Sequence, residues 1–204
     1  KARIADSYNQ TRDYPKKSYP LELNYQMMRI RARVITSKTM SAEIEKIRGS
    51  LNTENEEMRT AYEYGLALAL TRELHFDEAR SLTQHLRDKY PMNIPFRIAE
   101  AETYKRAQQA DRAIELLEHA LDLNTKNYPL TVNLAKAFIA ARKPHAALEV
   151  LIPLSVERPS DESIWYLLAE AFGLASNVPG VHEARAEFFV LNGNFDQAIK
   201  QLSY

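Results

Sequence analysis

Apolar residues recur every three to four positions along most of the chain. In residues 161–176 they occupy positions i, i+3, i+4 and i+7, one face of an α-helix: Trp165, Leu168, Ala169 and Phe172. Residues 113–120 show the same spacing. Short links that contain Asp, Asn, Gly or Pro, such as residues 75–77 and 191–196, separate these segments. The pattern predicts a chain of helices joined by tight turns.

The helical segments repeat with a period of 34 residues. Three columns of equivalent positions carry this period: Ala79, Ala113 and Ala147; Ala67, Ala101, Ala135 and Ala169; Leu70, Tyr104, Phe138 and Phe172. A period in this range is typical of solenoids built from helix pairs, in which small residues let neighbouring helices approach closely. Each repeat is therefore expected to contain two helices.

One phrase occurs twice at a distance that does not fit the period. FDEA begins at Phe76 and FDQA begins at Phe195, 119 residues later, which is three and a half periods. Half a period corresponds to one helix. The spacing therefore predicts a half-repeat shift near residue 178, where residues 175–180 (ASNVPG) interrupt the chain, with one helix beyond the regular register.

The segment WYLLAEAF, residues 165–172, resembles the tetratricopeptide pattern W-x2-L-G-x2-Y, with Ala in place of Gly and Phe in place of Tyr. The resemblance implies an all-α tetratricopeptide solenoid. We expect the following organisation: a connector at 1–18 and a repeat domain at 19–204, made of a variant helix pair at 19–51, regular repeats at about 60–93, 94–127 and 128–161, and shifted C-terminal helices at 162–204.

The composition excludes several classes of partner and chemistry. Twenty-seven basic and twenty-seven acidic residues cancel, so no net basic charge favours nucleic acid or a membrane surface. There is no cysteine, and no apolar run approaches the ~18 residues of a membrane span. Because the first residue is Lys1, we expect the chain to be a piece or a processed product of a longer protein.

Catalytic and metal-binding residues are not expected in this chain. His182 and Glu183 begin like the zinc-protease motif H-E-x-x-H, but the position of the second His is Ala186. His85 and His119 are one period apart, yet no third ligand accompanies them. Nucleotide-binding and nucleophile motifs are absent from the sequence. We predict no enzyme and no cofactor here; a self-contained metal enzyme, the alternative, would need a ligand set.

The candidate binding site is the concave face, which the first helix of each pair lines in such solenoids. By analogy with the family pattern, we place twelve residues there: Tyr64, Leu68, Arg72, Ile98, Glu102, Lys105, Arg106, Val132, Asn133, Lys136, Tyr166 and Glu170. This mixture of aromatic, aliphatic and charged groups suits an extended peptide or protein segment. The Lys/Asn/Arg clamp that some members use for a terminal carboxylate does not match these positions.

Longer phrases resemble one family, the bacterial periplasmic zinc metallopeptidases with a C-terminal tetratricopeptide domain. They occupy residues 3–34, 62–80 and 179–202. The resemblance implies a periplasmic location and an upstream H-E-x-x-H peptidase domain, outside this chain, that would hold zinc. It also implies three partners: the outer-membrane β-barrel assembly machinery, its β-barrel substrates, and the protein's own peptidase domain. In the alternative, the chain is a free-standing tetratricopeptide scaffold whose gene product begins close to Lys1.

Overall fold

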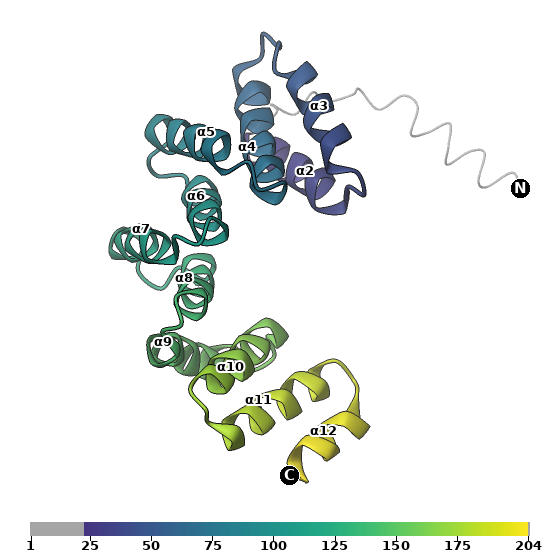
Figure 1. Ribbon diagram of the computed structural model, residues 1–204, viewed down its shortest axis with the longest axis vertical. Coiled ribbons are helices and arrows are strands. Elements are labelled where there is room, and N and C mark those ends of the chain that lie inside the picture. The colour runs from purple at the N-terminus through teal and green to yellow at the C-terminus, as the bar shows by residue number, and fades with distance from the viewer. Residues whose placement is uncertain (1–22, 204) are drawn as a thin grey trace, which may run out of the picture.

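The computed structural model describes residues 23–203 as eleven helices joined by short turns (Figure 1). The helices are α2 (Leu23–Thr36), α3 (Met40–Ser50), α4 (Glu56–Arg72), α5 (Phe76–Lys89), α6 (Ile94–Arg106), α7 (Ala110–Leu123), α8 (Tyr128–Ala140), α9 (Pro144–Glu157), α10 (Glu162–Leu174), α11 (Val178–Leu191) and α12 (Phe195–Leu202). The predicted all-α solenoid is confirmed, and no strand occurs between residues 23 and 203. The expected connector, 1–18, lies outside the described residues.

The 34-residue period sets where the helices begin. Helices α5, α7, α9 and α11 begin at residues 76, 110, 144 and 178, and α6, α8 and α10 begin at 94, 128 and 162. Helix α4 packs on α5, α6 packs on α7, and each pair packs on the next. In Figure 1 the pairs form an arc, with α4, α6 and α8 toward its inside and α5, α7 and α9 along its outside.

Each corner between the two helices of a pair contains one residue in the left-handed conformation. These residues recur every 34 positions, with φ between 55° and 66°: Leu74, Gln108, Arg142 and Ser176. The left-handed residue turns the chain back so that the next amide can reach into the preceding helix. In the first corner, for example, the amide of His75 donates to the carbonyl of Leu70 at 2.9 Å. Leu70 belongs to the column of large residues seen in the sequence.

Asparagine and aspartate begin the first helix of each pair. The side chains of Asn93 and Asn127 accept hydrogen bonds from the amides of Phe96 and Leu130, and Asp161 has the same role at α10. These side chains satisfy amides that have no partner within the helix. The same type of cap occurs at α11 and α12, where the side chains of Asn177 and Asn194 accept hydrogen bonds from amides of the first turn.

The predicted half-repeat shift lies at α11. The link from α11 to α12 has the same length as the corners within pairs, and Gly193 takes the left-handed position with φ of 71°. The amide of Asn194 donates to the carbonyl of Phe189 at 2.8 Å, as in the other corners. Helix α11 therefore follows one corner, as a second helix does, and precedes another, as a first helix does. The phrases FDEA and FDQA both follow this type of corner, which explains their recurrence.

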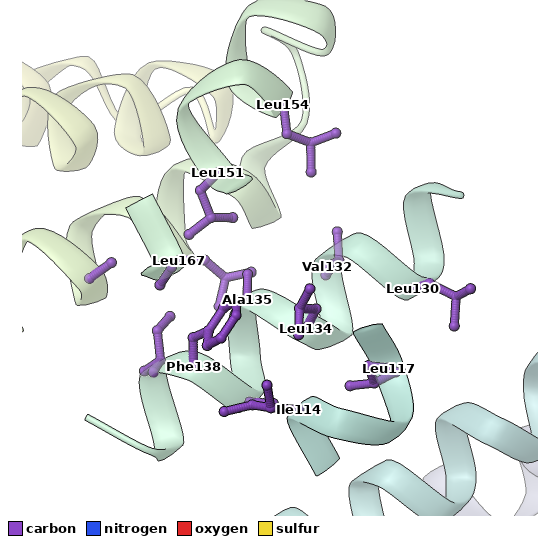
Figure 2. Packing of buried hydrophobic residues seen from close by; sticks show 14 of the residues in the cluster. Ile114, Leu117, Leu130, Val132, Leu134, Ala135, Phe138, Leu151, Leu154 and Leu167 are labelled. Carbon is purple, nitrogen blue, oxygen red and sulfur yellow. The ribbon is translucent and has the colours of Figure 1, made fainter. Parts of the chain in front are cut away.

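The alanine columns and the large apolar residues form the core. Ala79, Ala113 and Ala147 are fully buried, and Phe138 is 8% exposed. Figure 2 shows Phe138 surrounded by aliphatic side chains of α7 to α10. A second cluster joins α2 and α3 to α4, α5 and α6. This core holds the first helices in fixed register, so the side chains on their inner face keep fixed relative positions.

Candidate protein-binding groove

Three adjoining hollows follow the inner face of the solenoid, and we refer to them together as the inner groove. The first, of about 480 Å³, is lined by α2, α4, α6 and α8. The second, of about 500 Å³, is lined by α6, α8, α10 and the corner after α8, and the third, of about 340 Å³, by α10 and α11. Lys105 and Lys136 border the first two hollows, and Tyr166 and Glu170 border the last two. A single extended segment can therefore follow the groove without leaving it.

The first hollow carries a strong excess of positive charge. Its basic lining residues are Arg31, Arg72, Lys105, Arg106 and Lys136. Glu102 is the one carboxylate among the described residues that line it. Five positive groups against one negative group leave four uncompensated charges in this hollow, although the basic and acidic residues of the whole chain cancel.

Two of these arginines are held by neutral hydrogen-bond partners. Nη1 of Arg72 donates to the carbonyl oxygens of Val34 and Ile35 at 2.7 and 3.1 Å, at the end of α2. Nη1 of Arg31 lies 3.4 Å from the hydroxyl oxygen of Tyr64. Because these partners carry no charge, both guanidinium groups keep their positive charge available to a ligand.

Lys136 lies at the centre of this electrostatic arrangement. Partial burial lowers the pKa of Lys136, and the neighbouring Lys105 and the more distant Arg31 lower it further, while Glu102 opposes them. Glu102 is itself paired with Lys105, with 2.6 Å between Oε2 and Nζ. An anion placed beside Lys136 would relieve this repulsion, and the geometry therefore favours a carboxylate or another anionic group in the groove.

The third hollow is aromatic. The rings of Tyr166 and Phe188 lie 6.0 Å apart between centroids, and those of Phe188 and Phe189 lie 5.7 Å apart. Tyr166 is 58% exposed, which is high for an aromatic side chain inside a concave surface. Exposed, clustered aromatic side chains are common contact residues at protein interfaces.

Eleven of the twelve residues placed on the concave face from the sequence border one of these hollows. Val132 does not: it is 7% exposed and belongs to the buried core, although it lies one period after Ile98 and one period before Tyr166, which line the groove. Tyr64 lines the first hollow but is 2% exposed, so it offers little contact area. Whether these residues bind a partner remains a prediction.

The sequence reasoning missed several lining residues. Arg31 comes from α2, whose repeat pattern is one residue out of step with the later helices. Arg185, Phe188 and Phe189 come from α11, which counts as a second helix in the regular pattern. The recurrence of the phrase FDQA was the available signal for α11, because it shows that this helix also precedes a corner.

An outer hollow of about 700 Å³ between α5, α6 and α7 contains a buried ion pair. Nη1 of Arg87 lies 2.9 and 3.1 Å from the two carboxylate oxygens of Glu100, whose side chain is fully buried. Burial raises the pKa of Glu100, and the charge of Arg87 lowers it to a smaller extent. Because acidic and basic groups occur together here, the outer hollow lacks the charge excess of the inner groove.

Two of the histidines considered in the sequence lie in different parts of the solenoid. No three His, Cys, Asp or Glu side chains lie close enough to hold a metal ion within the part of the chain that the structure describes. His119 lines the outer hollow, whereas Nδ1 of His182 lies 3.0 Å from Oε1 of Gln201. Among the described helices, none has the length and apolarity to cross a bilayer.

Comparisons with known proteins agree with this fold. A sequence model of the tetratricopeptide repeat family matches residues 104–171. A thermophilic tetratricopeptide protein of Thermus thermophilus is similar in structure, with a TM-score of 0.68 and 14% identity over 87% of this chain and 96% of its own. A putative kinesin light chain of Podospora anserina has a TM-score of 0.61 and 19% identity, covering 86% of this chain and 97% of its own.

A third structure, YrrB, is described as a tetratricopeptide protein with an unusual peptide-binding site. Its TM-score is 0.57 and its identity 12%, over 89% of this chain and 90% of its own. No curated protein matches the sequence. Fold, repeat match and structural similarity together define the fold of the chain as a tetratricopeptide-like solenoid.

Proposed function

We propose that the inner groove captures an extended segment of a partner protein. The observation that carries this proposal is that the three hollows adjoin along α2, α4, α6, α8, α10 and α11, with shared lining residues at both junctions. An extended peptide needs a long channel with polar and apolar contacts in alternation, and this groove offers both. Because the first helices are fixed by the core, the groove is largely preformed, which reduces the entropic cost of binding.

We further propose that the chain serves a bacterial periplasmic zinc metallopeptidase in the maturation and quality control of outer-membrane β-barrel proteins. The support is the resemblance of residues 3–34, 62–80 and 179–202 to proteins of this kind, among them the β-barrel assembly-enhancing protease. The partners would be the assembly machinery, its β-barrel substrates and an upstream peptidase domain. Zinc would belong to that upstream domain.

The division of labour follows from the chemistry of the two parts. The described residues hold no three-ligand metal cluster, and the sequence has no H-E-x-x-H motif, so peptide hydrolysis would take place elsewhere. The solenoid would hold or present a segment, and the peptidase domain would cleave it or release it. The alternative of a free-standing scaffold has the same groove and differs only in the absence of an attached peptidase.

Site-specific photo-crosslinking in living cells tests this proposal. Probes are placed in the native gene product at Ile98 and Tyr166 in the groove, and at Met92 and Val156, which are 73% and 77% exposed and line none of the three hollows. We expect crosslinks to barrel proteins or their assembly machinery from the groove probes alone. Crosslinks from the outer probes alone would refute the groove as the binding surface, and groove crosslinks only to unrelated proteins would refute the barrel-assembly role.

A further inference from the structure

We propose that the inner groove selects acidic segments that carry an aromatic residue close to their carboxylates, with the acidic part beside Lys136 and the aromatic ring between α10 and α11. This inference rests on the proposed function, because it assumes that the groove is the binding surface, and it adds the chemistry of the partner and the places of its acidic and aromatic residues in the groove.

Charge complementarity places the acidic part. Five basic groups face the first hollow, and the charge of only one of them, Lys105, is compensated there by a carboxylate, that of Glu102. The basic groups come from α2, α4, α6 and α8, so four different helices contribute to the charge of the hollow. An excess of positive charge in a partly enclosed site concentrates the electrostatic field, which attracts anionic ligands and disfavours cationic ones.

The kind of anion follows from the shape of the site. Lys136 and Asn133 lie on α8 in the middle of the groove, and the hollow continues past them in both directions. A chain terminus is therefore not required, and side-chain carboxylates of a continuous segment fit the site. Arginine forks such as those of Arg31 and Arg72 bind carboxylates with two parallel hydrogen bonds.

The aromatic ring is placed by the third hollow. This hollow has a volume of about 340 Å³ and is lined mainly by apolar groups, those of Tyr166, Ala169, Phe188 and Phe189. Its polar lining residues are Glu170 and Arg185. Rings pack against one another in tilted or edge-to-face geometry, as the rings of Tyr166 and Phe188 already do. A partner's Phe, Tyr or Trp can extend this arrangement, whereas a charged residue there would lose its hydration.

The spacing between the two features follows from the solenoid. Packed helices are about 8–10 Å apart, and an extended chain advances about 3.3 Å per residue, so one helix-to-helix step corresponds to about three residues. Lys136 is on α8, Tyr166 is on α10 and Phe188 is on α11. The aromatic residue of the partner is therefore expected about three to six positions from its carboxylates.

The experiment uses the 204-residue chain and three fluorescent synthetic peptides with blocked ends. Each has a Gly/Ser background and a Phe about four positions from a variable pair of residues, which is Asp-Asp, Ser-Ser or Lys-Lys. Fluorescence anisotropy gives the dissociation constants. We expect the Asp-Asp peptide to bind about tenfold more tightly than the Ser-Ser peptide, the Lys-Lys peptide to bind least, and the preference to shrink as salt is raised.

Charge-reversal variants locate the site. Lys136→Glu should abolish the preference for Asp-Asp, and the exposed Arg106→Glu should weaken it, whereas Lys46→Glu on α3 should leave it unchanged. Because Lys136→Glu replaces one of several mutually repelling cations, its thermal unfolding midpoint should equal or exceed that of the wild type. If the variant loses the preference for the Asp-Asp peptide but keeps its thermal unfolding midpoint, the loss is caused by the changed charge in the groove and not by unfolding.

The outcomes separate this inference from the proposed function. Equal binding of the Asp-Asp and Ser-Ser peptides, both weakened by Tyr166→Lys, would overturn the acidic selectivity and retain a peptide-binding groove. An Asp-Asp preference that survives Lys136→Glu would overturn the assignment of the site. If no peptide binds while groove probes still crosslink partners in cells, the acidic–aromatic class is refuted and the protein-binding function stands.

Discussion

Replacing Gly65 by alanine tests how the variant N-terminal pair is joined to the regular repeats. Gly65 is buried on α4, and a Cβ atom there would lie 2.1 Å from Cγ2 of Ile30 and 3.5 Å from its Cβ. Carbon atoms in favourable contact are about 3.5–4.0 Å apart, so α2 would have to move by about 1.5 Å. Ile30 is fully buried and β-branched, and its side chain cannot rotate away cheaply.

The expected magnitude is the balance of two effects. Overpacking of a core costs about 1–3 kcal/mol, whereas exchanging glycine for alanine within a helix contributes about 0.5–1 kcal/mol of stability. Gly65→Ala should therefore lower the free energy of unfolding by about 1–2 kcal/mol. Because α2 carries Arg31, the displacement should also weaken binding of acidic peptides in the inner groove.

Urea unfolding followed by far-UV circular dichroism measures the change. Gly49→Ala is the matched control, because a Cβ at Gly49 on α3 would meet no atom within 4 Å, and this variant should be slightly more stable than the wild type. Adding Ile30→Ala to Gly65→Ala should cost less than the two separate losses together, because the clash is removed. If Gly65→Ala is as stable as Gly49→Ala, then α2 does not pack on α4 as described.

Three further changes test the core, a buried amide and the outer ion pair. Phe138→Ala should cost about 3–5 kcal/mol in urea unfolding, because this ring fills the space between α7 and α10. Gln26→Met should raise the free energy of unfolding by about 1–3 kcal/mol, since the fully buried amide of Gln26 has no hydrogen-bond partner among the described residues. Arg87→Ala should cost about 2–3 kcal/mol at pH 8, because it leaves the carboxylate of Glu100 buried and unpaired.

The pH dependence of the last variant follows from Glu100. Burial raises its pKa in the folded state above the ordinary value of 4.5, and loss of Arg87 raises it further. A group with a raised folded pKa contributes stability that is present below its unfolded pKa and lost as pH rises through its folded pKa. Arg87→Ala should therefore lose more stability between about pH 5 and pH 8 than the wild type does. An equal loss in both proteins would contradict the buried pair.

The repeat architecture could be predicted from the sequence because its causes are local. The alanine columns record where helices approach closely, and the large residues before each corner, such as Leu70, accept the hydrogen bond that closes the turn. The phrase FDQA correctly indicated a half-repeat shift, since it follows the same corner as FDEA. Eleven of the groove residues were likewise predictable, because many inner positions of first helices are equivalent from one repeat to the next.

The remaining features depend on how helices rotate against one another. Val132 has the same repeat position as Ile98 and Tyr166 and still belongs to the core, so the period alone does not resolve its burial. The contribution of Arg31 depends on the docking of α2, where the repeat pattern is out of step. Phe188 reaches the groove because α11 belongs to two corners, which the helical period does not indicate and the phrase FDQA does.

The central claim is that the inner groove is where this solenoid captures its partner. A competition experiment tests this claim most directly. The purified native protein, bound to its cellular partner, carries a photo-crosslinker at Ile98. The crosslinker is activated in the presence of increasing amounts of the Asp-Asp peptide. We predict that the crosslink at Ile98 disappears as the peptide saturates, while a crosslinker at Met92 gives no partner crosslink at any concentration. A crosslink at Ile98 that persists at saturating peptide would contradict an acidic segment as the occupant, and partner crosslinks only at Met92 would contradict the groove itself.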